Sequence, residues 1–200
     1  MARLGMVIDL KRCIGCNACT IACKAEQATP KGVFWCRVLE REEGKYPHVK
    51  RIFLPVQCNH CQDAPCEKVC PTGATQQRPD GIVMVDYARC IGCRACMTAC
   101  PYQVRFYGKE IQGYFPGGLT PFEEMGYKRF QPGTVQKCTF CVERVEAGLE
   151  PACVQTCPAK ARYFGDLEDG DGEVARLIVE RHAFRLRPEM GTEPSIYYLA

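Results

Sequence analysis

Seventeen cysteines in a chain of 200 residues constrain the fold of this protein more than any other feature of its sequence. Sixteen of them stand in four compact groups of four, and one, Cys36, stands apart. Group one is Cys13, Cys16, Cys19 and Cys23; group two is Cys58, Cys61, Cys66 and Cys70; group three is Cys90, Cys93, Cys96 and Cys100; group four is Cys138, Cys141, Cys153 and Cys157. Cysteines this close in sequence bridge one another only with strain but converge easily on a metal. The pattern therefore favours metal ligation over a disulfide scaffold.

Groups one and three lie in two copies of nearly the same stretch, CIGCNACTIACK at 13–24 and CIGCRACMTACP at 90–101. In both copies an aspartate, Asp9 or Asp86, stands four residues before the first cysteine and follows apolar residues. We interpret the repeat as a duplicated unit. Each unit is predicted to be a short strand, a cysteine-bearing loop and a helical turn that ends at the fourth cysteine.

The spacing C-x2-C-x2-C-x3-C of groups one and three is the bacterial ferredoxin signature for a [4Fe–4S] cluster. In that pattern the first three cysteines hold one cluster and the fourth ligates the other cluster of a pair. Groups two and four keep the x2 start and the x3 end and lengthen the loop between them. Sixteen thiolates at four for each cluster predict four [4Fe–4S] clusters. The spacing leaves open which groups pair.

Other classes of function fit the sequence less well. A zinc site explains a single C-x2-C pair but not two full ferredoxin signatures. The net charge is only +3, without a long basic run, so nucleic-acid binding is not expected. No apolar run approaches the ~20 residues of a membrane span. The N-terminal MARLGMVIDL shows neither a signal-peptide apolar region nor a twin-arginine pair, so we expect export, if any, to occur with another protein.

The segments between the groups carry weaker signals. A turn at Pro79-Asp80-Gly81 predicts a β-hairpin between groups two and three. Residues 108–136 hold glycines, prolines and aromatics without a cysteine, and could pack on their own domain or form an interface. Apolar spacing at Val174, Leu177 and Ile178 predicts a helix. The final LRPEMGTEPSIYYLA is expected to form an extended arm that could lie on a partner.

The stretches LGMVIDLKRCIGCNACTIACK, CNHCQDAPCEKVCPTGA, CIGCRACMTACPY and KCTFCVERVEAGLEPACVQTCP resemble one known family. This is the four-cluster ferredoxin-like electron-transfer subunit of complex iron–sulfur molybdoenzymes, such as dimethyl sulfoxide, polysulfide, thiosulfate, tetrathionate and arsenate respiratory reductases. The resemblance implies an α+β fold of two interleaved ferredoxin-like lobes, each holding two [4Fe–4S] clusters. The implied parts are a lobe at 1–50 plus 136–170, a lobe at 51–107, an irregular insertion at 108–135, and a helix with a C-terminal arm at 171–200.

The same resemblance implies which cysteines share a cluster. We name the four implied ligand sets in order. Set 1 is Cys13, Cys16, Cys19 and Cys157; set 2 is Cys138, Cys141, Cys153 and Cys23; set 3 is Cys58, Cys61, Cys66 and Cys100; set 4 is Cys90, Cys93, Cys96 and Cys70.

The implied function is electron transfer without catalysis, since the sequence shows no substrate-site motif. Relatives work with a catalytic subunit that binds a molybdenum or tungsten bis-pterin cofactor, and with a quinone-reactive membrane subunit or another carrier, in anaerobic respiration. The chain is then expected at the membrane through a partner, on the periplasmic face after co-export, or alternatively in the cytoplasm. A cytoplasmic polyferredoxin of a hydrogenase or soluble oxidoreductase is the main alternative. A structural zinc protein is a more remote one.

Residues outside the sets receive plainer interpretations. Cys36 and Trp35 are expected in the core, and His60 is expected not to ligate, because group two is already complete. The cations beside the groups could raise cluster potentials or could simply be solvated. They are Lys11, Arg12, Arg89, Arg94 and Lys137.

Overall fold

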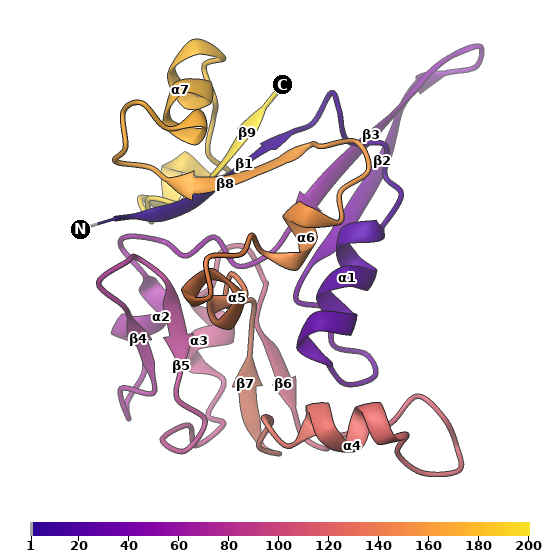
Figure 1. Ribbon diagram of the computed structural model, residues 1–200, viewed down its shortest axis with the longest axis vertical. Helices are drawn as coiled ribbons and strands as arrows, with labels where there is room; N and C mark the ends of the chain where they lie inside the picture. The colour runs from indigo at the N-terminus through magenta and orange to yellow at the C-terminus, as the bar shows by residue number, and fades with distance from the viewer. Residues whose placement is uncertain (1) are drawn as a thin grey trace.

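The computed structural model describes residues 2–200, which form short helices and strands joined by the cysteine-bearing loops (Figure 1). The strands are β1 (Leu4–Asp9), β2 (Arg37–Lys45), β3 (His48–Val56), β4 (Thr75–Gln77), β5 (Val83–Val85), β6 (Phe106–Gly108), β7 (Thr134–Gln136), β8 (Arg162–Asp166) and β9 (Ile196–Leu199). The helices are α1 (Ala18–Gln27), α2 (Pro65–Lys68), α3 (Ala95–Thr98), α4 (Pro121–Tyr127), α5 (Val142–Glu146), α6 (Ala152–Gln155) and α7 (Glu173–Glu180), with a 3-10 turn, η1, at Pro188–Met190. None of the helices in residues 2–200 has the length and apolar character needed to cross a bilayer.

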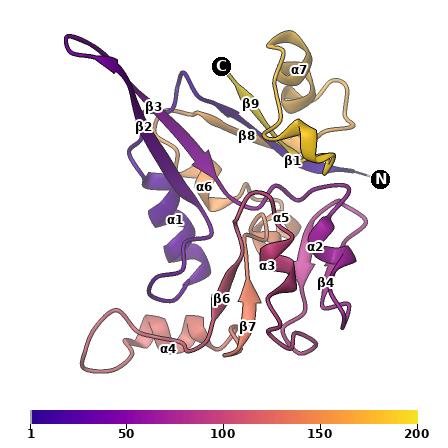
Figure 2. The same ribbon diagram turned by 180° about the vertical axis from the view of Figure 1, so that it is seen from behind.

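The two ends of the chain meet in one three-stranded sheet of order β8-β1-β9. Strand β1 runs antiparallel to β8 and parallel to β9, and its central residues Met6, Val7 and Ile8 are fully buried. Figure 2 shows α7 over this sheet and the two termini within it. The sheet therefore ties the first cysteine group to the fourth, because β1 leads into group one and β8 follows group four.

The C-terminal residues are a structural strand, which departs from the expectation of an arm lying on a partner. Ile196, Tyr198 and Leu199 are buried in β9, and the Tyr198 hydroxyl donates to the Pro55 carbonyl at 2.9 Å. The alternation of apolar residues at the end of the chain is thus explained by pairing with β1. Helix α7 forms where the apolar spacing predicted it.

The duplicated unit predicted from the sequence is present in both copies. Strand β1 is followed by the group-one loop and α1, and β5 by the group-three loop and α3. The Asp9 carboxylate accepts hydrogen bonds from the backbone N–H groups of Lys11 and Arg12, and Asp86 accepts from Ala88. Such Asx turns bend the chain directly after a strand, which explains why an aspartate recurs four residues before each group.

The predicted hairpin between groups two and three is confirmed. Strands β4 and β5 pair antiparallel, with Thr75 opposite Val85. In the turn, Gly81 has a φ of +82° and the Asp80 carboxylate accepts from the Ile82 N–H at 3.0 Å. A positive φ of this kind suits glycine, as the Pro-Asp-Gly sequence indicates.

The insertion between groups three and four contains short pieces of regular structure. Strands β6 and β7 pair at its base, and it contains α4, whose first turn is closed by a capping box between Thr120 and Glu123. Hydrogen bonds from the backbone N–H groups of Thr120 and Tyr114 lower the pKa of Glu123 to about 2. One side of the insertion buries Tyr127 and Phe130 in the core. The other side exposes apolar side chains, which are Phe115, Phe122 and Met125.

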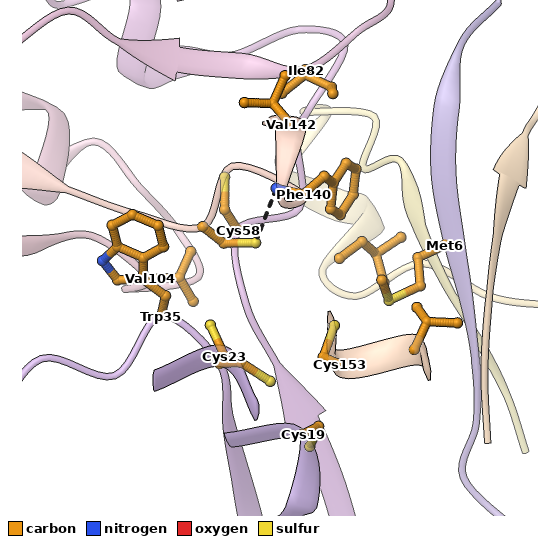
Figure 3. Packing of buried hydrophobic residues seen from close by; sticks show 14 of the residues in the cluster. Met6, Cys19, Cys23, Trp35, Cys58, Ile82, Val104, Phe140, Val142 and Cys153 are labelled. Carbon is orange, nitrogen blue, oxygen red and sulfur yellow. Dashed lines mark hydrogen bonds between the residues drawn. The ribbon is translucent and has the colours of Figure 1, made fainter. Parts of the chain in front are cut away.

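The core itself contains cysteines at its centre. Cys19, Cys23, Cys58, Cys138 and Cys153 pack in one cluster with Met6, Ile8, Trp35 and Phe140 (Figure 3). Trp35 is 3% exposed and Cys36 2% exposed, so their predicted core positions are confirmed. Cysteine side chains thus occupy much of the space that apolar side chains would fill in the core of another small protein.

Candidate metal-cluster sites

Three hollows in the protein are each ringed by four cysteines. Their cysteines are Cys13, Cys16, Cys19 and Cys157 in the first, Cys58, Cys61, Cys66 and Cys100 in the second, and Cys70, Cys90, Cys93 and Cys96 in the third. In every case three cysteines come from one sequence group and the fourth comes from another. These are the members of sets 1, 3 and 4.

The cysteines of set 2 also lie together, in the centre of the molecule. Burial raises the pKa of Cys138, and the charges of Cys23, Cys141 and Cys153 raise it further. Figure 3 shows Cys23 on α1 and Cys153 on α6 on the same side of the core. All sixteen grouped cysteines are therefore brought together in four sets, and all seventeen cysteines are free thiols. Ligation of a cluster by each set stays a prediction.

The loops around the hollows require glycine at one position in each repeat. Gly15 has a φ of +69° and Gly92 a φ of +67°. A Cβ on Gly92 would lie 2.1 Å from the carbonyl oxygen of Gly133, and one on Gly15 would lie 2.3 Å from the Phe53 ring. The CIGC sequence thus contains a glycine both for its backbone conformation and for close packing.

Backbone N–H groups point at several of the cysteine sulfurs. Thr75 donates to Cys70 Sγ at 3.5 Å, Phe140 to Cys138 Sγ at 3.4 Å, and Ala161 to Cys157 Sγ at 3.3 Å. Such N–H groups stabilise thiolates and raise the potential of a cluster that the thiolates hold.

Three buried cations near the cysteine sets indicate the sign of the charge that the hollows could hold. Arg105 and Arg162 are each 4% exposed and Lys137 is 2% exposed. No carboxylate in residues 2–200 forms an ion pair with any of the three. An unpaired buried charge costs several kcal/mol, so an anionic group must lie nearby. Arg105 donates to the Cys66 sulfur at 2.8 Å, and a [4Fe–4S] cluster with four thiolates carries the net negative charge that these cations require.

A single zinc ion fits the sites less well. Zinc binds sulfur at about 2.3 Å, so its four ligands nearly touch. Among residues 2–200, no three histidine, cysteine, aspartate or glutamate side chains gather as closely as one metal ion needs. The cysteines surround hollows instead, which fits a cluster of several irons.

The structure separates the five cations named from the sequence into two kinds. Lys11, Arg12, Arg89 and Arg94 are exposed, and the Arg94 guanidinium stacks 3.8 Å from the Tyr107 ring centroid. Lys137 is buried and its ammonium donates to the carbonyl oxygens of Val83 and Cys138. Of the five, Lys137 has the charge that solvent screens least, because the other four side chains are exposed.

Two functional candidates were missed by sequence reasoning. Arg105 and Arg162 contact the cysteine sets, yet neither stands beside a group. A signal does exist, since each follows the fourth cysteine of its group by five residues, in CPYQVR and CPAKAR. The shared spacing points to a function only because both arginines are buried, and burial could not be seen from the sequence.

His60 and Phe140 occupy matching places in the C-x2-C starts of groups two and four. Their rings stack with centroids 3.8 Å apart, and His60 Nδ1 accepts from the Val83 N–H at 3.0 Å. Burial keeps the pKa of His60 well below its ordinary value, so the ring is neutral. His60 lies in none of the four sets.

Cys36 is buried as expected, but it has polar contacts. Its sulfur lies 3.4 Å from Nη2 of Arg162, and a hydrogen bond from Cys36 helps to hold the pKa of Cys19 below its ordinary value. Cys36 therefore touches a set 1 cysteine without belonging to the set.

We expect Cys36→Ala to leave the iron content unchanged. The substitution removes one small buried side chain outside every set, so it should lower the free energy of unfolding by only about 1 kcal/mol. Iron analysis and a thermal melt of the anaerobically purified variant measure both quantities. Loss of about four irons would instead place Cys36 among the ligands.

Comparisons with known proteins indicate iron–sulfur clusters in this chain. Two models described as a 4Fe-4S dicluster domain match the chain, one at residues 49–114 and 119–167 and the other at 12–74. The chain is 46% identical to a putative dimethyl sulfoxide reductase iron-sulfur subunit of Halobacterium salinarum, over 100% of this chain and 79% of that protein.

Two further relatives are similar over nearly the whole chain. An arsenate respiratory reductase iron-sulfur subunit of Shewanella is 40% identical, over 98% of this chain and 96% of its own length. A subunit of the tetrathionate reductase of Salmonella typhimurium is 44% identical, over 98% of this chain and 72% of its own length.

Proposed function

The chain belongs to the 4Fe–4S dicluster family of respiratory-reductase iron–sulfur subunits, and on that premise we propose that it relays electrons through four [4Fe–4S] clusters. Sets 1 to 4 hold one cluster each, with sets 1 and 2 in one ferredoxin-like lobe and sets 3 and 4 in the other. The chain performs no catalysis of its own. Its clusters connect a catalytic subunit to a second electron carrier.

The order of the four sets is the observation that carries this proposal. Sets 1 and 2 meet at Arg162, which donates to Cys153 and contributes to the lining of the set 1 hollow. Cys138 of set 2 and Cys58 of set 3 pack in the same buried core cluster. Sets 3 and 4 meet at Arg105. The sets therefore form a row from 1 to 4, which suits stepwise electron transfer.

The two ends of the row differ from its centre in exposure. Cys16 of set 1 and Cys93 of set 4 are exposed, whereas all four cysteines of set 2 are buried. Beside them, Ile14 is 61% exposed and Ile91 67% exposed, at matching positions of the repeat. Exposed apolar residues next to an exposed ligand suit a docking surface where electrons enter or leave.

We place a molybdenum or tungsten bis-pterin catalytic subunit at the set 1 end and a quinone-reactive membrane subunit, or another carrier, at the set 4 end. The similarity to iron–sulfur subunits of dimethyl sulfoxide and arsenate reductases, and to a tetrathionate reductase subunit, supports this arrangement over a hydrogenase-linked polyferredoxin. The chain then lies at the periplasmic face of the membrane through its partners. The exposed apolar side chains of the insertion, including Met125 at 74% exposure, are a further surface for such a partner.

Iron analysis of the protein purified without oxygen tests the proposal. About sixteen irons and sixteen sulfides are expected for each chain, with absorbance near ~400 nm that bleaches when a reductant is added. A catalytic subunit should co-purify, and the isolated chain should accept electrons without turning over a substrate. About eight irons, zinc in their place, or turnover by the chain alone would contradict the proposal.

A further inference from the structure

Arg162 lies between the two cysteine sets of the first lobe. Its Nη1 donates to the sulfur of Cys153 in set 2 at 3.8 Å, and the guanidinium lines the set 1 hollow together with Cys19. Gln57 Oε1 accepts from Nη1 at 3.3 Å and the Met6 sulfur lies 3.5 Å from it. Neutral groups thus hold the guanidinium in place, and none of them cancels its charge.

Arg105 has the same position in the second lobe. Its Nη2 donates to the sulfur of Cys66 in set 3 at 2.8 Å, and Cys66 shares a buried cluster with Cys96 of set 4, close enough for the arginine charge to act on Cys96. Its Nη1 donates to the hydroxyl of Thr75 at 3.2 Å. The set cysteines beside the two arginines, Cys153 and Cys19 or Cys66 and Cys96, are all the third cysteines of their groups, so the two arginines occupy equivalent places in a duplicated site. Arg162 differs in one contact, because its Nη2 also donates to the Cys36 sulfur at 3.4 Å.

We propose that Arg105 and Arg162 set the reduction potentials of the relay, each raising the potentials of both clusters in its own lobe. This inference rests on the proposed function, because it requires a cluster in every set. Reduction adds a negative charge to a cluster, and a buried cation beside the ligand sulfurs stabilises that charge strongly. Because one guanidinium serves two clusters, their potentials move in the same direction, and the difference between the two potentials changes less than either potential does.

The exposed Arg94 provides the matched comparison. It also belongs to the lining of the set 4 hollow, but its side chain is open to solvent and stacks on Tyr107. Water and salt screen such a charge, so its effect on the cluster is expected to be small. Burial, rather than the presence of a cation, distinguishes Arg105 from Arg94.

The test is a redox titration of the full-length chain, purified without oxygen and followed by electron paramagnetic resonance. Arg105→Gln is expected to lower the midpoint potentials of two clusters, those of sets 3 and 4, and to leave the other two unchanged. Arg162→Gln is expected to do the reverse. Arg105→Lys and Arg162→Lys keep the charge and should restore most of the shift, and Arg94→Gln should leave all four potentials unchanged.

If the glutamine variants lose iron, their potentials cannot be measured. A second substitution, which leaves the arginine in place, then tests the proposal. Gln57→Glu keeps the size of the residue that contacts Arg162 and sets a negative charge beside the guanidinium. It is expected to lower the potentials of the set 1 and set 2 clusters together. Retained iron with unmoved potentials in Gln57→Glu or in either glutamine variant overturns the proposal, as does an equal shift in Arg94→Gln.

These results separate the inference from the proposed function. If four clusters are present and their midpoint potentials do not change when either arginine is replaced, only the inference is overturned. A wild-type chain without four clusters would overturn the proposed function first. Potentials that shift as expected, in a chain that passes no electrons to a reductase, would overturn the relay and leave the role of the arginines standing.

Discussion

Replacing Cys70 with alanine is expected to remove or convert the cluster at Cys90, Cys93 and Cys96, and to spare the cluster at Cys58, Cys61 and Cys66. The reason is the crossed arrangement, in which Cys70 belongs to group two by sequence but lines the hollow of group three. Iron should fall by up to about four of sixteen atoms. Because set 4 ends the row, electron flow to the second carrier should fall to a small fraction of the wild-type value.

Spectroscopy identifies the cluster that is lost. Iron analysis, electron paramagnetic resonance and electron transfer to a quinone analogue in the complex measure the three effects. Cys36→Ala is the matched control, since it removes a thiol outside every set. Loss of the group-two cluster after Cys70→Ala would show that each group holds its own cluster, which contradicts the crossed assignment.

Removing the iron is expected to unfold most of the chain. The largest core cluster contains five cysteines of the sets among its buried residues, and a second one is built around Cys61, Cys66 and Cys96. Without clusters, these buried thiols would be repelling thiolates or unpaired thiols around empty space, and the short helices would have little left to pack on. Chelation should therefore abolish the cooperative melting transition and make the chain sensitive to protease.

One part of the molecule should resist longer than the rest. The sheet of β1, β8 and β9 and helix α7 share an apolar cluster without a cysteine, built on Val7, Val174 and Leu199. Hydrogen exchange of the iron-free chain should find its slowest amides there. An iron-free chain that melts cooperatively at the holo-protein temperature would show that the clusters contribute little to folding.

The sequence by itself determined the chemistry of this protein. The number and spacing of the sixteen grouped cysteines indicate [4Fe–4S] ligation wherever the chain runs, because a tight loop with cysteines at x2 intervals wraps a cluster locally. The strand before each ferredoxin signature, the hairpin at Asp80-Gly81 and helix α7 were also predictable. These features depend on short-range backbone preferences, which adjacent residues express directly.

Only the tertiary structure decided how these local pieces act on one another. Spacing alone could not say that Cys157 joins Cys13, or that Cys70 joins Cys90, because such contacts depend on the packing of distant segments. The C-terminal segment was predicted to be an extended arm that could lie on a partner, whereas it pairs with β1, because a strand's pairing depends on a distant segment. For the same reason, Arg105 and Arg162 were not singled out from the sequence. Burial and the loss of solvent screening give an arginine its electrostatic effect, and both arise only when the chain closes around it.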